Sequence, residues 1–151
     1  MVENHPQRIY LVEEQPNPST DFFVLPALKL AGCDERTEII RSGFTELPPI
    51  EKLNNAVVIF VRYIPQPWKR QITVAQTQIA RVIYFMDDDL LQLRASQGMP
   101  WRYRLKLARL ATLRERWLKR IGAELWVSTP FLLNKYADWN PLLVAPKPLA
   151  G

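Results

Sequence analysis

The sequence predicts an α/β fold with a mostly parallel sheet of about six strands. Short runs of β-branched and aromatic residues alternate with helical segments, and one run, 56–63 (AVVIFVRY), is almost wholly apolar. Such a run is typical of a strand that helices cover on both faces, as in a parallel sheet. A second apolar run, 81–86, ends abruptly in three aspartates. We therefore expect a single Rossmann-like domain of three layers that spans residues 1–151.

Length and composition agree with one globular domain. The chain has 151 residues, of which 48% are hydrophobic and 23% charged, and these are ordinary values for a soluble domain. The single cysteine, Cys33, cannot form an internal disulfide, which favours a reducing compartment. No stretch approaches the roughly 18 apolar residues that span a bilayer, and residues 1–7 hold no apolar signal core. We expect a cytoplasmic protein with flexible tails at 1–7 and 146–151.

The first third of the chain predicts a strand, a helix and a second strand. Residues 8–13 (RIYLVE) are rich in β-forming side chains, and prolines follow them. Ser19 or Thr20 can cap a helix over 22–30, and the proline inside that range means that the helix is short, kinked or begins later. The alternating run 37–41 (TEIIR) predicts the second strand.

The middle third predicts the two central strands. A short polar helix or turn leads to the strand at 56–63, which Pro65 and Pro67 end. Residues 72–79 can form a short helix, and the next strand covers 81–86.

The last third predicts a long basic helix and two further strands. The helix begins at Trp101 and ends near Ile121, where Gly122 stops it. A strand follows at 124–128. Thr129 and Pro130 then form an N-cap and a first helical position before a short helix over 131–136. The last strand covers 141–145.

The three aspartates, Asp87–Asp89, mark a candidate site. They follow the strand at 81–86 directly, and ligands of open α/β sheets bind outside the carboxyl ends of the strands. The carboxylates could hold Mg²⁺, orient substrate hydroxyls, or complement a helix N-terminus. The only histidine, His5, lies in the expected N-terminal tail, and no phosphate-binding glycine loop is present. These absences exclude a histidine triad and a histidine metal site.

The segment 101–120 carries most of the positive charge. It holds eight basic residues and one acid, a net charge of +7, whereas the whole chain carries +5. On a helical wheel, five basic residues share one side: Arg102, Lys106, Arg109, Arg116 and Arg120. The segment is either a surface helix with solvated charges or an element that binds an anionic surface, either lipid headgroups or nucleic acid.

Three runs of sequence resemble the N-terminal half of GT-B glycosyltransferases, most closely the group-1 family. These runs are VIYFMDDDLL at 82–91, IGAELWVSTPFLLNKY at 121–136 and PLLVAPKPL at 141–149. The family has an aspartate-rich turn after a strand, then a long helix, a strand that ends in Ser-Thr, and a last strand that leads to a second domain. The resemblance covers most of the chain.

The resemblance implies that this Rossmann-like domain binds the acceptor, a glycan or a lipid-linked sugar. It assigns acceptor binding to residues at the ends of three strands: Asp87, Asp88, Asp89, Ser128, Thr129, Asn17 and Ser19. In the family a second domain binds the nucleotide-sugar donor, and we expect that C-terminal donor-binding domain to be absent from this chain. The glycine-rich first turn and the histidine base of many members are absent too. We therefore expect no metal and no cofactor in this chain, and no transfer without a donor-binding partner.

The same resemblance implies a role for the basic segment 101–120. Many enzymes of this type attach peripherally to anionic membranes, so the inner face of a membrane is a candidate partner for Arg102, Lys106, Arg109, Arg116 and Arg120. The alternative function is a non-catalytic Rossmann-like binding module at such a surface. Nucleic-acid binding ranks below both, because the basic residues are confined to one helix that must also cover the sheet.

Overall fold

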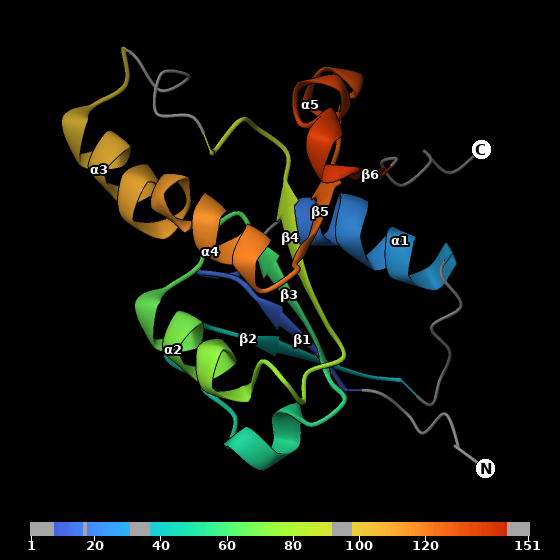
Figure 1. Ribbon diagram of the computed structural model, residues 1–151. Coiled ribbons are helices and arrows are strands. Elements are labelled where there is room, and N and C mark those ends of the chain that lie inside the picture. Colours follow the sequence, from blue (N-terminus) through green and yellow to red (C-terminus); the bar gives the residue numbers. More distant parts are fainter. Residues whose placement is uncertain (1–7, 17, 31–36, 92–97, 145–151) are drawn as a thin grey trace.

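Six parallel strands form one sheet in the computed structural model, and helices cover both of its faces (Figure 1). The strand order is β2-β1-β3-β4-β5-β6. The strands are β1 (Arg8–Val12), β2 (Glu38–Ser42), β3 (Val57–Val61), β4 (Arg81–Met86), β5 (Glu124–Val127) and β6 (Leu142–Leu143). The predicted α/β class, with about six parallel strands in a Rossmann-like domain, is confirmed.

The structure describes residues 8–16, 18–30, 37–91 and 98–144. Asn17, Cys33 and the tails expected at 1–7 and 146–151 lie outside these ranges. The helical elements are η1 (Thr20–Val24), α1 (Leu25–Leu30), η2 (Ile50–Leu53), α2 (Gln66–Ala75), α3 (Trp101–Leu110), η4 (Thr112–Arg114), α4 (Glu115–Arg120), α5 (Pro130–Lys135) and η5 (Ala137–Trp139).

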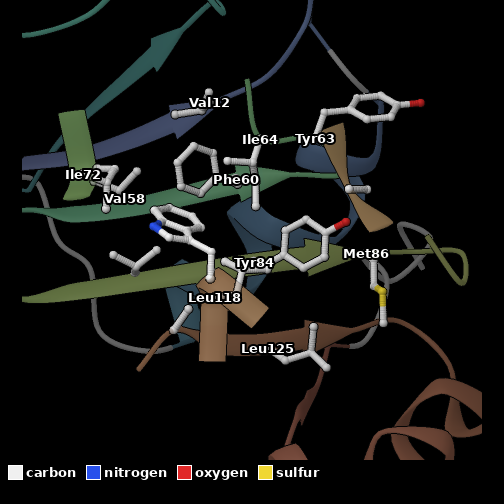
Figure 2. Packing of buried hydrophobic residues seen from close by; sticks show 14 of the residues in the cluster. Val12, Val58, Phe60, Tyr63, Ile64, Ile72, Tyr84, Met86, Leu118 and Leu125 are labelled. Atoms are coloured by element: carbon white, nitrogen blue, oxygen red, sulfur yellow. The ribbon is translucent and has the colours of Figure 1, made fainter. Parts of the chain in front are cut away.

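The central strand β3 divides the core into two layers. All five of its residues are buried, and alternate side chains point to opposite faces. Val58 and Phe60 pack with α2 and α4 on one face, where Trp68 and Leu118 are also buried. On the other face, Ile59 and its neighbours pack against α1. Figure 2 shows the first layer around Phe60. The rings of Phe60 and Trp68 pack edge to face there, with 6.2 Å between their centroids.

The helix expected over 22–30 begins earlier and contains a π-helical segment. In η1 the N–H of Leu25 donates to the carbonyl of Thr20, five residues back. Pro26 follows at once, and a proline lacks the N–H of a regular turn and crowds the carbonyl four residues before it. The wider π turn therefore lies directly before the proline. The expected capping role is wrong, because Ser19 has helical dihedrals and makes no side-chain capping bond, and Thr20 donates to Glu13 instead.

The helix expected at 72–79 begins six residues earlier in the structure. The helix α2 covers Gln66–Ala75, with Pro65 as its N-cap residue and Pro67 in its first turn. The strand expected over 56–63 ends earlier, at Val61, where the backbone turns at Arg62. The two prolines therefore begin the helix and do not end the strand. A proline in the first helical turn removes an N–H that has no partner within the helix, so it is well tolerated there.

The long basic helix expected from Trp101 to Ile121 is broken at Ala111. This residue has φ −135° and ψ −68° and separates α3 from η4 and α4. The carbonyl of Leu110 accepts from the backbone N–H of Ile64 at 2.7 Å. Arg114 Nε in turn donates to the Ile64 carbonyl at 3.1 Å. The bond from Ile64 takes the place of a helical bond at the Leu110 carbonyl, and the Arg114 side chain adds a second contact to the loop after β3.

We predict that Trp68→Ala lowers the free energy of unfolding by about 3–5 kcal/mol. Trp68 is fully buried, and its indole N–H donates to the Gly43 carbonyl at 3.0 Å. Urea denaturation followed by circular dichroism measures the change. The matched control on the same helix is Val74→Ala, because Val74 is exposed and its truncation should change stability by less than about 0.5 kcal/mol. Equal stability of the two variants would contradict this account of the core.

Candidate functional site

The carboxyl ends of β1 and β3 lie where the direction of strand addition reverses, and β4 is the next strand beside β3. From β1 the chain continues through α1 to β2 on one side, while β3 lies on the other side of β1. The connecting helices α1 and α2 cover opposite faces of the sheet. In doubly wound sheets such a switch point opens a crevice outside the carboxyl ends of the strands. The residues just after these strands are therefore the candidates for ligand contact.

Arg62, the first residue after β3, has an unusual backbone conformation. Its φ is +73°, in the left-handed region. The N–H of Tyr63 donates to the carbonyl of Val61 at 2.9 Å, which closes a γ-turn around Arg62, and a γ-turn with positive φ at its centre is strained. The buried hydroxyl of Tyr84 donates to the Arg62 carbonyl at 2.7 Å. The backbone N–H of Arg62 donates to the Phe85 carbonyl at 2.9 Å. These contacts hold the strained turn in place.

The Arg62 side chain binds the first two aspartates of the triplet. Its Nη1 atom is hydrogen-bonded to Asp87 Oδ1 and lies 3.6 Å from Asp88 Oδ2. Burial lowers the pKa of Arg62, but Asp87, Tyr63 and Tyr103 together outweigh this effect and leave the pKa raised. The guanidinium is thus a permanent cation that neutralises Asp87. The Asp88 side chain is 74% exposed, whereas that of Asp87 is 20% exposed, so Asp88 is the carboxylate that a ligand can reach.

Asp87 joins β4 to the start of η1. Its second oxygen, Oδ2, accepts a hydrogen bond from the Ser19 hydroxyl. The predicted site residues Ser19 and Asp87 are therefore in contact, although 68 positions separate them. The neighbouring Asn17 lies outside the part of the chain that the structure describes.

Asp89 joins β4 to α5. Its carboxylate accepts from the Tyr136 hydroxyl at 2.5 Å and from Lys135 Nζ, and only 9% of its side chain is exposed. Burial and the hydrogen bond to Asp89 raise the pKa of Tyr136. The third aspartate therefore ties two elements together and offers little surface to a ligand.

Ser128 and Thr129 form hydrogen bonds with backbone groups. The Ser128 hydroxyl donates to the backbone carbonyl of Asp87 at 3.4 Å, which is long for a hydrogen bond. Thr129 caps α5, because its Oγ1 accepts from the Leu132 N–H at 3.2 Å. Both residues lie at the carboxyl end of β5, as expected, beside the aspartate triplet.

The inner side of α3 contributes residues that the sequence did not single out for this site. Lys106 Nζ forms an ion pair with Glu14 Oε1 at 2.7 Å and lies 4.8 Å from the centre of the Tyr63 ring. Burial and nearby Tyr63 raise the pKa of Tyr103, and the charge of Asp88 adds to this shift. Tyr103 and Lys106 therefore line the carboxyl edge, and Lys106 does not belong to an outward-facing cationic surface.

A surface pocket of about 420 Å³ lies beside this cluster, at the ends of β1 and β2. Glu13, Pro16, Arg41 and Glu46 are among its lining residues. The carboxylate of Glu13 is buried and accepts from Arg41 Nε and from Thr20 Oγ1, each at 2.6 Å. The hydrogen bond to Glu13 is the main reason that the pKa of Arg41 is raised. Since the Glu13 carboxylate is already bonded, this network mainly holds η1 against β2.

The helix-capping interpretation of the triplet is wrong for the described residues. Asp87 and Asp88 lie in bends and Asp89 in a loop, and no helix begins at them. Within the described ranges, no group of three acidic, histidine or cysteine side chains is placed to hold a metal ion. The same ranges contain no helix that is long and apolar enough to cross a membrane.

Comparison with protein-family models, with curated proteins and with solved structures finds no match for this chain. The geometry of the carboxyl edge therefore carries the functional argument. The Asp88 carboxylate is exposed there, and the partly buried side chains of Tyr103 and Ser19 lie in the same cluster around Arg62. Such groups can accept hydrogen bonds from a hydroxyl-rich ligand and donate hydrogen bonds to it.

We predict that Arg62→Gly is more stable than Arg62→Ala by about 1 kcal/mol. Both changes remove the guanidinium and its bonds to the aspartates, but only glycine adopts φ +73° without strain. Parallel urea denaturation of the two variants measures the difference. Equal stabilities would mean that the turn relaxes and that its strain is not a property of the backbone.

We predict that the stabilising effect of the Tyr136 hydroxyl depends on pH. The pKa of Tyr136 is raised in the folded protein by burial and by Asp89, so the effect is fully present below the unfolded pKa of about 10 and is lost as the pH rises further. Tyr136→Phe should cost about 1.5–3 kcal/mol at neutral pH, and the cost should shrink above about pH 10. Urea denaturation of both proteins across this range measures it. A cost that stays constant to high pH would contradict the assignment.

Proposed function

We propose that this chain is the acceptor-binding half of a glycosyltransferase with two Rossmann-like domains. The resemblance of the three sequence runs to the group-1 family motivates the proposal. The parallel sheet agrees with the fold that the resemblance implied. A separate domain would supply the nucleotide-sugar donor.

The observation that carries the proposal is the arrangement around Arg62. Asp87 is neutralised by Arg62 and bonded to Ser19, and Asp89 is held by α5. Asp88 remains as an exposed carboxylate near the phenol of Tyr103. A carboxylate accepts hydrogen bonds from adjacent sugar hydroxyls, and an aromatic ring packs against the apolar face of a sugar. The arrangement therefore suits a saccharide.

The roles of the remaining predicted residues follow from their contacts. Ser19 holds Asp87 and lies close enough to the edge to meet a ligand there. Ser128 and Thr129 shape the neighbouring turn, and Asp89 anchors that turn to α5. We assign direct acceptor contact to Asp88 and Tyr103, and positioning to Arg62, Asp87 and Asp89.

We predict that short oligosaccharides of hexose and N-acetylhexosamine bind at this edge. Titration of the ¹⁵N-labelled protein should give saturable shifts of the amide signals of Asp88, Tyr103 and their neighbours. Asp88→Ala should weaken binding about tenfold or more, because a hydrogen bond to a charged group contributes roughly 1.5–3 kcal/mol.

The control carboxylate is Glu38, which is exposed at the first position of β2, the opposite end of the strands. Glu38→Ala should leave the affinity unchanged. A nucleotide-sugar alone should give no shifts at the carboxyl edge, since donor binding is assigned to another domain. If no saccharide produces saturable shifts, or if the two alanine variants behave alike, the proposal fails.

A further inference from the structure

Lys69 of α2 lies between two contacts that hold η4 and α4 against that helix. Just before α2 begins, Arg114 Nε donates to the Ile64 carbonyl at 3.1 Å. One turn after Lys69, the Thr73 hydroxyl donates to the Lys69 carbonyl at 2.7 Å and accepts from the Trp117 indole N–H at 3.0 Å. Both helices pack on the same face of the sheet (Figure 1). Lys69 therefore lies where η4 and α4 pack against α2.

Arg114 and Arg120 bring two further positive charges to Lys69. Arg120 follows Trp117 by three residues in α4, so it lies about one turn beyond the contact with α2. Burial lowers the pKa of Lys69, and the charges of Arg114 and Arg120 lower it further. Three like charges gathered at one place repel one another, and an anion among them would relieve that repulsion.

No acid compensates these cations in the part of the chain that the structure describes. The helix α2 contains no acidic residue, and Glu115, the one acid of α4, forms its ion pair with Lys119 at 3.0 Å. None of the described ion pairs involves Lys69, Arg114 or Arg120. The three cations therefore form a cluster without a protein counter-charge.

Arg114 differs in this respect from Arg62, although both side chains are partly buried. Burial lowers the pKa of Arg62, but the carboxylate of Asp87 and two nearby tyrosines outweigh this effect. Burial alone acts on Arg114, and it leaves the pKa lowered. Its Nε is bonded to a carbonyl, while Nη1 and Nη2 have no hydrogen-bond partner among the described residues. Such a guanidinium is suited to an anion, because removing a cation from water costs less beside a negative charge.

We propose that Lys69, Arg114 and Arg120 bind the phosphate group of a soluble phosphate monoester. Such a group carries a charge of about −1.5 to −2 near pH 7 and has three acceptor oxygens, so it suits a compact cluster of three cations. Arg114 can donate two parallel hydrogen bonds to it through Nη1 and Nη2, and the Lys69 ammonium adds a point charge. The inference does not depend on saccharide binding at the carboxyl edge, since no described ion pair joins these cations to the aspartate triplet.

The test is an NMR titration of the ¹⁵N-labelled protein with inorganic phosphate and with glucose 6-phosphate, at constant pH and ionic strength. We expect saturable shifts of the amide signals of Lys69, Arg114 and Arg120, with a dissociation constant of about 1 mM or below. Equal affinities would assign recognition to the phosphate alone, and tighter binding of the hexose phosphate would identify a phosphorylated sugar as the ligand.

Two variants test the cluster without removing a described side-chain hydrogen bond or ion pair. Lys69→Gln should weaken phosphate binding about tenfold, because a charge-assisted contact is lost. Arg120→Gln should weaken it about threefold, since Arg120 is exposed and water screens its charge. In phosphate-free urea denaturation, Lys69→Gln should be at least as stable as the unchanged protein, because the repulsion from Arg114 and Arg120 is removed.

The matched controls are Arg70→Gln on α2 and Arg116→Gln on α4. Each removes one exposed positive charge from an element that carries the cluster. Neither should change the affinity for phosphate by more than about twofold, because salt screens exposed charges that do not contact the ligand. Circular dichroism checks that all four variants fold.

Three results would overturn the inference. Shifts that do not saturate would mean that phosphate has no defined site. Equal weakening by Lys69→Gln and Arg70→Gln would mean that net charge alone attracts the anion. A DNA duplex that removes the phosphate shifts, binds far more tightly and depends on the same cations would assign the cluster to a nucleic-acid backbone.

Discussion

The ion pair between Arg62 and Asp87 joins the carboxyl ends of the two central strands, and the surrounding loops depend on it. Arg62 can reach Asp87 because its backbone turns sharply after β3, and the Tyr84 hydroxyl and the Phe85 carbonyl hold that turn. Asp87 extends the connection to Ser19 and hence to the helix on the opposite face. A buried charge without its partner would be costly. The pair therefore fixes the positions of three loops from two faces of the sheet.

Most of the fold was predictable because the strands are short apolar runs between turn residues. The strand at 81–86 was predicted with its observed bounds, and the strand at 56–63 was predicted as buried on both faces. The helices were less predictable. The expected start of α2 was too late because Pro65 and Pro67 were read only as the end of a strand, although a proline is tolerated in the first turn of a helix. The break at Ala111 depends on hydrogen bonds to Ile64, and periodicity contains no information about such distant partners.

The location of the candidate site was predictable from the sequence, but the different roles of its three aspartates were not. An acidic triplet after an apolar strand predicted a site at the carboxyl edge, and Asp87–Asp89 lie there. The three carboxylates differ because their partners come from distant segments: Arg62, Ser19, Lys135 and Tyr136. One signal was available in the sequence, since Arg62 is the only charged residue in the run 56–63. A lone charge at the end of a buried strand points towards a partner of opposite sign.

The hydrogen bond from Ile64 to Leu110 has a consequence for motion. The same short loop after β3 contains Arg62 and Ile64, so the end of α3 is attached to the residue pair that organises the carboxyl edge. The amide of Ile64 can exchange its hydrogen with solvent only when α3 separates from that loop. The exchange rate of this one amide therefore reports how often the basic helix leaves the sheet. Any contact that restrains the outer side of α3 would slow the exchange and stiffen the Arg62 turn at the same time.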